Sequence, residues 1–272
     1  WRDAPTCFST ARSTRGGTAS STIAGPGRPA GTSVRLTPIP SGRNLDFVAA
    51  KASEPVITSA VGDYLKAIWS LSRDGPASTN AIAERLGFTP ASVSGMLARL
   101  AESGLVDHVR YRGATLTDAG RHEALRLIRR HRLVETFMIR ELGYGWDEVH
   151  DEAEAIEHAV SDRFAERLAA LLGDPTHDPH GDPIPRADGR LPATPDAPLP
   201  ELIEGEILVV ARLLSQDGDT LAYLAERGIE PGSRLRLTGR EPDGGLLEVE
   251  VDGVPTSLSR DLAERIRGEV DS

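Results

Sequence analysis

Cysteine is nearly absent from this sequence of 272 residues, which contains only Cys7. A single cysteine cannot form an internal disulfide, and this composition is typical of a reducing compartment, so we expect a cytoplasmic protein. The same scarcity excludes thiolate ligands from any metal site outside the first residues of the chain. Long apolar runs are also lacking. Because no stretch of about 18 apolar residues exists, the sequence predicts no membrane span and no membrane partner.

The sequence also lacks the overall positive charge that is usual in nucleic-acid-binding proteins, since its formal net charge is -10. The charges are unevenly distributed, however. Residues 56–130 contain 10 basic and 7 acidic residues, whereas residues 141–166 contain nine acidic residues and a single basic one, Arg163. Such segregation is typical of a nucleic-acid-binding face beside a cation-binding region. Charges that merely solvate helices would explain the acidic excess, but not its segregation.

Residues 1–55 are rich in Ser, Thr, Gly, Pro and Arg and have no sustained hydrophobic period. They cannot bury enough apolar surface to offset the entropy of ordering, so we expect a disordered tail. The tail has no apolar core of a secretory signal. The chain begins with Trp1 rather than Met, as expected of a fragment or of a misassigned start.

Residues 56–120 have the pattern of a winged helix-turn-helix. Apolar residues at helical spacing predict short helices at about 58–71, 79–86 and 90–103, and a hairpin is predicted over 105–116. Two short helices joined by a tight turn and followed by a hairpin form a unit that reads double-stranded DNA. Helices used only for packing would not explain why the caps, a face of small residues and a basic hairpin occur together.

The third predicted helix presents small and polar residues near its beginning. Hydroxyl groups and free N–H groups there bind phosphates, and an alanine methyl can contact a thymine methyl. Arginines of the hairpin are placed to bind the DNA backbone or the minor groove. The candidate DNA-contacting residues are Thr89, Ala91, Ser92, Ser94 and Gly95 on the helix, and Arg110 and Arg112 in the hairpin.

The rest of the chain predicts a second helical unit and a small β domain. Helices are expected at about 117–142 and 147–172, and residues 173–200 are rich in Pro, Asp and Gly, as linkers are. From residue 207 onward, short β-branched and Leu-rich runs predict an SH3-like β-barrel. The fold is therefore expected to be mostly α with a small β part. We divide it into a tail (1–55), a winged helix-turn-helix domain (56–120), a helical metal-binding and dimerisation domain (121–192), a linker (193–202) and an SH3-like domain (203–270).

Histidine and carboxylate residues recur at four-residue spacing in the second helical unit. His131 and Glu135 share one helix face, and His150, Glu154 and His158 follow at the same interval, with Glu157 adjacent. A divalent ion needs such convergence, because its ligands must replace water at fixed distances. A solvated acidic helix is the alternative reading of this pattern.

Several short motifs resemble the diphtheria toxin repressor family of metal-dependent regulators. The resemblance extends over about residues 56–270, including the C-terminal SH3-like (FeoA-like) domain. Its motifs are Asp63-Tyr64-Leu65, Ala83-Glu84-Arg85-Leu86, Ser92-Val93-Ser94, Ser103-Gly104-Leu105-Val106, His131-Arg132-Leu133-Val134-Glu135, His150-Asp151-Glu152-Ala153-Glu154 with Glu157-His158, and Gly181-Asp182-Pro183-Ile184-Pro185. The resemblance implies a homodimeric repressor that binds operator DNA when an ion occupies sites between its DNA-binding and dimerisation domains.

The resemblance also implies which residues bind metal. One site would contain Asp63, Glu154, Glu157 and His158. The other would contain His131, Glu135 and His150, completed by an acid of the C-terminal domain, Asp217 or Asp219.

Carboxylates at positions 63 and 154 resemble the manganese-type members, since iron-type members typically carry Met or Cys there. Hard oxygen ligands suit Mn²⁺, so we expect Mn²⁺, with Fe²⁺ as the alternative. Lys66 stands where some two-domain manganese regulators have a further Glu, which favours separate sites in a three-domain layout.

Two other classes of function remain open at this point. A metal hydrolase would need an open coordination position and a general base, and the sequence has no HExxH or other hydrolytic motif. A metal-independent winged-helix regulator would use the His/Glu helix only as an exposed interface.

Overall fold

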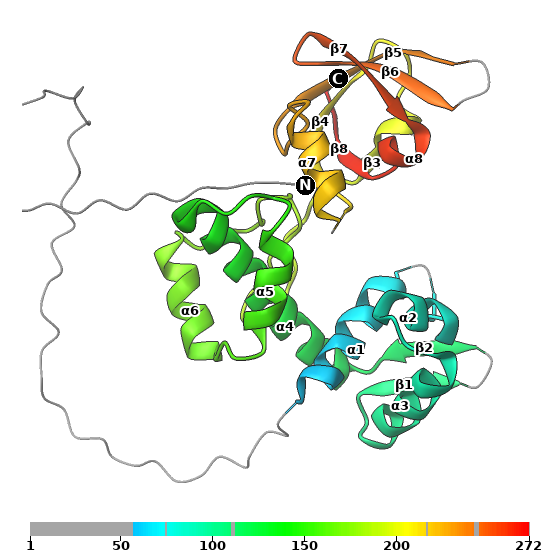
Figure 1. Cartoon of the computed structure of the whole chain (residues 1–272), viewed down its shortest axis with the longest axis vertical. Helices are drawn as coiled ribbons and strands as arrows, with labels where there is room; N and C mark the ends of the chain where they lie inside the picture. The colour runs from blue at the N-terminus through cyan, green and yellow to red at the C-terminus, as the bar shows by residue number, and fades with distance from the viewer. Residues whose placement is uncertain (1–56, 74, 110–111, 216, 242–244, 272) are drawn as a thin grey trace, which may run out of the picture. The chain divides into compact units, whose positions relative to one another are not determined.

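The computed structural model describes residues 57–73, 75–109, 112–215, 217–241 and 245–271. The tail expected at residues 1–55 and Arg110 of the hairpin lie outside these ranges. The described part of the chain forms a helical unit with a two-stranded hairpin, a second helical unit and a C-terminal β-sheet (Figure 1). The predicted fold class is therefore confirmed.

The N-terminal unit is the winged helix-turn-helix that the hydrophobic spacing predicts. It consists of α1 (Ser59–Leu71), α2 (Thr79–Leu86), α3 (Pro90–Glu102), β1 (Val106–Val109) and β2 (Gly113–Leu116). The two strands are antiparallel, with Val106 opposite Leu116. Fully buried Leu65, Ile82 and Leu97 pack its three helices around one core.

Side-chain caps fix where these three helices begin. The hydroxyl oxygens of Thr58, Ser78 and Thr89 accept hydrogen bonds from the backbone N–H groups of the first turns. Gly87 ends α2 in the left-handed region, at φ 68°, which a residue with a Cβ adopts only under strain. The tight turn between α2 and α3 thus follows from one glycine and one threonine.

The second unit contains α4 (Asp118–Phe137), a π-helical turn η1 (Met138–Leu142), α5 (Val149–Glu157) and α6 (Asp162–Leu171). The prediction of a single helix over 147–172 is wrong, because the helix ends at Glu157 and a new one begins at Asp162. Ser161 is the reason: its backbone is extended, and its hydroxyl accepts from Phe164 N to cap a new helix. The break lets α5 and α6 each pack against α4.

The first part of the expected linker is packed rather than extended. Ile184 is 1% exposed and belongs to the core of the helical unit. Arg132 donates a hydrogen bond to Pro183 O, and Arg129 donates one to Pro185 O. The prediction of a linker over 173–200 is therefore wrong up to about residue 186. This segment has no hydrophobic periodicity that the sequence could reveal, and buried apolar and polar contacts with the helices hold it in place.

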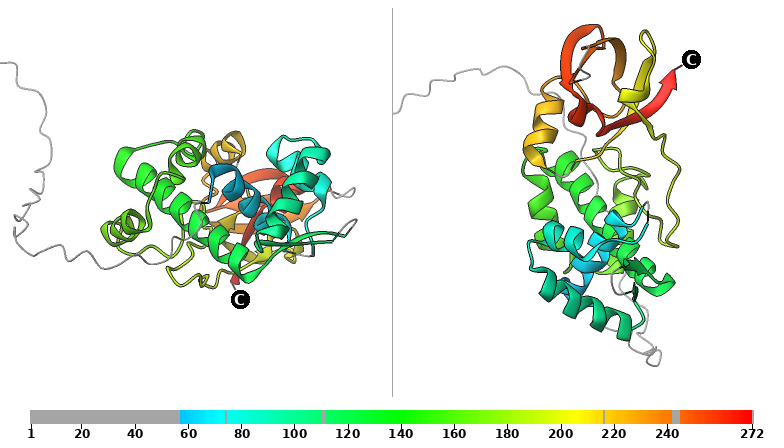
Figure 2. Two further views of the ribbon diagram at one scale, coloured as in Figure 1. Left: turned by 90° about the horizontal axis from the view of Figure 1, so that it is seen from below. Right: turned by 90° about the vertical axis from the view of Figure 1, so that its right-hand side faces the viewer.

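The C-terminal unit is a six-stranded antiparallel sheet in the order β3-β8-β4-β5-β6-β7. Its strands are coloured from yellow to red in Figure 2. Its elements are β3 (Ala197–Pro198), η2 (Leu199–Glu201), β4 (Ile207–Leu213), α7 (Gly218–Ala225), β5 (Arg234–Arg240), β6 (Leu246–Val251), β7 (Val254–Ser259), α8 (Arg260–Ala263) and β8 (Ile266–Asp271). Leucines and valines of the strands form its core with Leu221 and Leu224 of α7.

One helix contributes to two cores. Ala124 of α4 is buried in the N-terminal core, whereas Leu133 and Val134 of the same helix are buried in the core of the second unit. The side chain of Arg121 lies over the ring of Trp69 in α1, 4.8 Å from the ring centroid. Helix α4 is therefore shared by both helical units. No helix in the described ranges combines the length and the apolar character that crossing a bilayer requires.

Candidate metal centre and DNA-reading face

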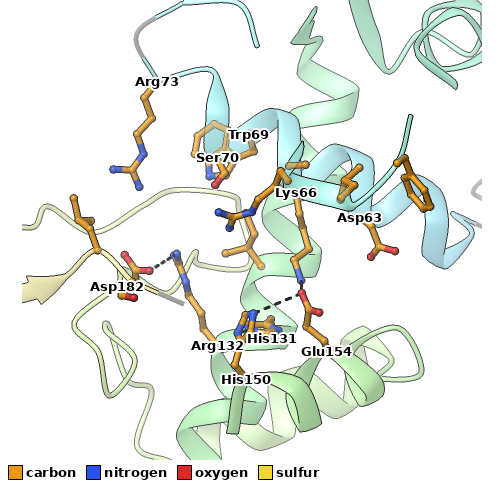
Figure 3. A pocket seen from close by; sticks show the side chains of 17 residues that line it. Asp63, Lys66, Trp69, Ser70, Arg73, His131, Arg132, His150, Glu154 and Asp182 are labelled. Carbon is orange, nitrogen blue, oxygen red and sulfur yellow. Dashed lines mark hydrogen bonds and ion pairs between the residues drawn. The ribbon is translucent and has the colours of Figure 1, made fainter. Parts of the chain in front are cut away.

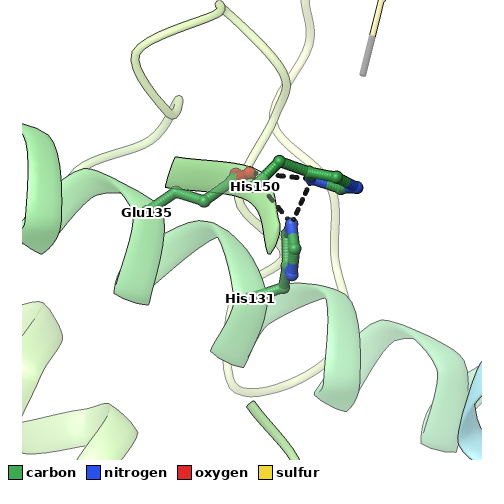
Figure 4. Close-up of side chains that lie close together, drawn as sticks. All are labelled: His131, Glu135 and His150. Atoms are coloured by element: carbon green, nitrogen blue, oxygen red, sulfur yellow. Dashed lines mark hydrogen bonds and ion pairs between the residues drawn. The ribbon is translucent and has the colours of Figure 1, made fainter. Parts of the chain in front are cut away.

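Helices α4 and α5 bring His131, Glu135 and His150 together (Figure 4). His131 Nε2 lies 2.9 Å from Glu135 Oε1 and 3.1 Å from His150 Nδ1, and His150 Nδ1 lies 3.2 Å from Glu135 Oε1. Two imidazole nitrogens and a carboxylate oxygen thus face a common point. This donor set suits a divalent transition metal ion.

A second group joins the two helical units. Asp63 of α1 accepts a hydrogen bond from His158 Nε2 over 2.9 Å, and Glu157 Oε1 lies 3.4 Å from the same nitrogen. Gly62 makes this approach possible, because a Cβ at that position would lie 2.8 Å from the His158 ring. An ion bound by these three residues would tie α1 to the end of α5.

Lys66 and Glu154 lie beside this second group, and Figure 3 shows them with Asp63. Lys66 Nζ donates to both oxygens of Glu157, over 2.7 and 2.9 Å, and lies 3.6 Å from Glu154 Oε1. The Glu154 side chain is 54% exposed, and its Oε1 is 3.7 Å from His150 Nε2. Glu154 therefore lies between the two groups rather than within the second one.

His131 connects the two groups, because its other ring nitrogen, Nδ1, lies 2.5 Å from Glu157 Oε2. Burial lowers the pKa of His131, but the carboxylates of Glu135 and Glu157 outweigh burial and raise this pKa to about 9. Burial raises the pKa of Glu135 and of Glu157, yet the charge on His131 outweighs it and holds both below their usual range. Without metal, the buried carboxylates are thus ionised and compensated by His131 and Lys66.

The structure adds a third group that the sequence reasoning missed. Asp178 and His180 lie within ligand distance of Glu135, and all three are buried. Burial raises the pKa of the Asp178 carboxyl to about 8 and lowers that of His180. His180 Nε2 is buried and has no hydrogen-bond partner among the described residues. A buried nitrogen of this kind is suited to bind an ion.

Asp217 lies in a different environment. Its carboxylate caps α7, accepting hydrogen bonds from the backbone N–H and the hydroxyl of Thr220, and it is exposed. The groups of possible ligands found in the described ranges do not include Asp217 or Asp219. The carboxylate that approaches Glu135 from outside the helices is instead Asp178, in the segment read as a linker.

A cleft of about 670 Å³ opens onto these residues. Asp63, Lys66, His131, His150 and Glu154 line it (Figure 3). Apolar side chains such as Trp69 and Phe88 complete the lining. The cleft therefore connects candidate ligands of both groups to solvent.

The predicted DNA-reading residues lie on one exposed stretch of α3. Thr89, Ala91, Ser92, Ser94 and Gly95 are all exposed, as is Arg112 in the turn of the hairpin. Thr89 caps the helix, and its hydroxyl also donates to Ser92 Oγ. The beginning of α3 therefore presents small side chains, hydroxyl groups and N–H groups to solvent, as DNA binding requires.

Three family descriptions match successive parts of the chain. Residues 57–114 match "Iron dependent repressor, N-terminal DNA binding domain", and residues 117–186 match "Iron dependent repressor, metal binding and dimerisation domain". Residues 197–270 match the FeoA domain. The matches follow the three structural units described above.

Curated relatives and solved structures agree with these matches. The iron-dependent repressor IdeR of Mycobacterium tuberculosis is 32% identical over 219 residues, covering 76% of this chain and 95% of the relative. The diphtheria toxin repressor of Corynebacterium diphtheriae is 31% identical over 217 residues, with 76% and 95% coverage.

Among solved structures, a manganese-dependent transcriptional repressor in complex with manganese is 46% identical, with a TM-score of 0.72, and the match covers 77% of this chain and 99% of that one. ScaR with bound Zn²⁺ is 35% identical, with a TM-score of 0.68 and coverage of 76% and 98%. The similar proteins thus include both iron- and manganese-dependent repressors.

Proposed function

This chain belongs to the iron-dependent repressor family, whose members are metal-dependent transcriptional repressors rather than enzymes, and we propose that Mn²⁺ is the ion that activates it. Fe²⁺ is the alternative. The candidate ligands are imidazoles and carboxylates, and the only cysteine lies at position 7. Hard oxygen donors favour Mn²⁺ over softer ions, whereas the general affinity order favours Fe²⁺ over Mn²⁺.

The observation that supports the proposal best is the contact between His158 and Asp63, which joins the two helical units at a group of metal-ligand side chains. We assign one ion to Asp63, Glu157 and His158, with Glu154 reaching in from the cleft. A second ion would be held by His131, Glu135 and His150. Asp178 and His180 also lie close to Glu135. In this proposal they, rather than Asp217, complete the coordination of the second ion.

Metal would act by fixing the angle between the DNA-binding and dimerisation units. A homodimer presents two recognition helices, which must match two half-sites at a set spacing on double-stranded operator DNA. An ion that binds better in the matching geometry shifts the population toward it, and its differential affinity is the coupling energy. In this proposal the protein acts on operator DNA in the cytoplasm and controls metal-ion homeostasis there.

In this proposal α3 reads the major groove and the hairpin contacts the DNA backbone or minor groove. Thr89, Ser92 and Ser94 offer hydroxyl groups, Ala91 a methyl group and Gly95 a close approach to the DNA. Arg112, and Arg110 outside the described ranges, would bind phosphates.

The test is a titration of DNA binding with each ion. A duplex is first selected from a random pool with the full chain and Mn²⁺, and its affinity is then measured against free Mn²⁺ or, anaerobically, Fe²⁺. We expect Asp63→Ala to lose metal-dependent binding, while Asp261→Ala, an exposed control in α8, retains it. Equal DNA affinity with and without metal would refute the proposal, and activation at lower free Fe²⁺ than Mn²⁺ would favour the iron alternative.

A further inference from the structure

We propose that Lys66 is a built-in cation of the second metal group, which an entering ion must displace from Glu157 before it binds Asp63, Glu157 and His158. In this way Lys66 sets the metal concentration at which the two helical units become fixed. The inference rests on the proposed function, because it concerns the same group of ligands.

The ammonium of Lys66 is bound to the carboxylate oxygens of Glu157 that an ion would need as ligands. Lys66 Nζ lies 2.7 and 2.9 Å from the two oxygens of Glu157, so the carboxylate is bound at both ends. The Glu157 side chain is 1% exposed and that of Lys66 only 16%. Water therefore screens this ion pair only weakly. Glu157 also has no solvent-exposed carboxylate oxygen at which an ion could bind before Lys66 leaves.

Charge makes the two cations compete. A divalent ion beside an ammonium in a partly buried site meets strong repulsion, because screening by water is reduced there. The ammonium of Lys66 already occupies both carboxylate oxygens of Glu157, so it must withdraw when the ion enters.

The structure provides a route for that withdrawal. Lys66 lines the cleft of about 670 Å³, and its four-carbon stem lets the ammonium move while the backbone of α1 stays in place. The neighbouring Glu154 side chain is 54% exposed, so water can hydrate the displaced ammonium at this edge of the cleft. Asp63 lies one helical turn before Lys66, so α1 carries both a ligand for the ion and its competitor.

The pairing also has a role before metal arrives. Lys66 and Asp63, both on α1, contact Glu157 and His158 at the end of α5. Removing the ammonium leaves a buried carboxylate less compensated, which destabilises the metal-free protein. Lys66 is therefore expected to have opposite effects on metal-free stability and on metal affinity, whereas a merely structural ion pair would affect only the former.

The experiment compares the full chain with Lys66→Met, Lys66→Gln and Lys66→Arg. Equilibrium dialysis measures the affinity for Mn²⁺, and thermal unfolding after chelation measures metal-free stability. We expect both neutral variants to bind Mn²⁺ at least about tenfold more tightly, which is about 1.4 kcal/mol, and to melt at a lower temperature without metal. Lys66→Arg keeps the charge and should bind Mn²⁺ like the unmodified chain.

Arg130→Met is the matched control. Arg130 is similarly buried, with 18% of its side chain exposed, and it pairs with Asp162 at a distance of 2.6 Å away from the metal groups. This variant should melt earlier but bind Mn²⁺ unchanged. Lys66→Gln, which can still donate a hydrogen bond to Glu157, serves if the methionine variant does not fold.

Each outcome decides between the two proposals. Unchanged or weaker Mn²⁺ binding in the neutral variants, with normal binding by the unmodified chain, overturns the role of Lys66 and leaves the proposed function standing. Binding by the neutral variants alone supports the role of Lys66 but overturns metal activation of the natural chain. Absence of binding in every form overturns both.

Discussion

His131 lies between the carboxylates of Glu135 and Glu157, and its two ring nitrogens contact one carboxylate each. The raised pKa of about 9 means that the metal-free protein carries an imidazolium here at neutral pH. A metal ligand must be a neutral imidazole, so an ion can bind only when this proton leaves. Proton release and metal uptake are therefore linked at a single residue.

This linkage predicts opposite pH dependences for metal-free stability and for metal affinity. The folded pKa of His131 lies above the unfolded value of about 6.5, so its contribution to stability is complete below that pH and is lost as pH rises through about 9. Asp178, with a pKa of about 8, acts in the same direction. Metal affinity should instead increase by up to about tenfold per pH unit over the same window.

Calorimetric titration with Mn²⁺ at pH 7.5, in buffers of different ionisation enthalpy, counts the released protons. Thermal unfolding of the protein after chelation, measured at pH values from 6.5 to 9, reports its metal-free stability. His122→Gln, at an exposed histidine of the same helix, should leave both results unchanged. The interpretation fails if binding releases no proton, or if metal-free stability rises across that range.

At the scale of the secondary-structure element, α3 presents its beginning to solvent over several exposed small residues. A negative charge placed there would face the phosphates of a bound duplex. We expect Ala91→Asp to weaken binding to the selected duplex at least about tenfold, about 1.4 kcal/mol, while Mn²⁺ affinity is retained. Fluorescence anisotropy with labelled duplex measures the first quantity and dialysis the second.

Val254→Asp is the control for this substitution. It adds the same charge at a residue of β7 that is 64% exposed in the C-terminal sheet. The assignment of α3 would be overturned if both variants bound the duplex as the unmodified chain does, or if both lost binding equally.

Elements with strong local signals could be predicted from the sequence. Thr58, Ser78 and Thr89 each precede an apolar pattern of period 3.6, so caps and spacing agree for α1 to α3. The break before α6 depends on Ser161, a single serine within a continuous amphipathic pattern, and was missed. Helix α7 and strand β8 were also missed, because a short helix or strand gives only a weak periodic signal.

The candidate site divides in the same way. Helical spacing alone places His131 and Glu135 on one face, whereas their grouping with His150 followed from the family resemblance. Asp178 and His180 could not be found in either way, since they lie in a segment without a period and reach Glu135 only through tertiary packing. The presence of two of the seven histidines within four residues, His177 and His180, was the available signal. Asp217 was expected only because the family resemblance implies an acid of the C-terminal domain, and it caps a helix instead.

At the scale of the whole molecule, the segment that carries Asp178 and His180 also contacts the C-terminal sheet. His180 O accepts a hydrogen bond from Leu213 N, and Asp182 pairs with the buried Arg212 of β4. Gly181, at φ 87°, lies so close to β4 that a Cβ would be 1.9 Å from Ala211 O. The third group of candidate ligands and the C-terminal domain therefore share one short piece of backbone.

We expect Gly181→Ala to loosen the C-terminal sheet, since both the left-handed conformation and the approach of β4 disfavour a side chain. Hydrogen exchange should increase over β4, the melting temperature should fall, and exchange in α1 to α3 should stay unchanged. Gly189→Ala is a matched control with a similar φ of 79°, whose Cβ would meet only Leu125, at 3.9 Å. Equal effects of the two variants would mean that backbone strain, not contact with β4, is responsible.

Helix α4 connects the hairpin to the candidate metal ligands and can act as a lever between them. Gly120, near its beginning, is packed so tightly that a Cβ would be 1.9 Å from Leu105 O, beside the hairpin, while His131 is a candidate ligand three turns later. Eleven residues of helix form a stiff rod of about 16 Å. A tilt of about 5° at the ligand end would therefore carry the hairpin through roughly 1.4 Å. In a symmetric pair of subunits this segment of α4 moves in both. A small change in coordination geometry would then displace each hairpin by nearly the length of a covalent bond.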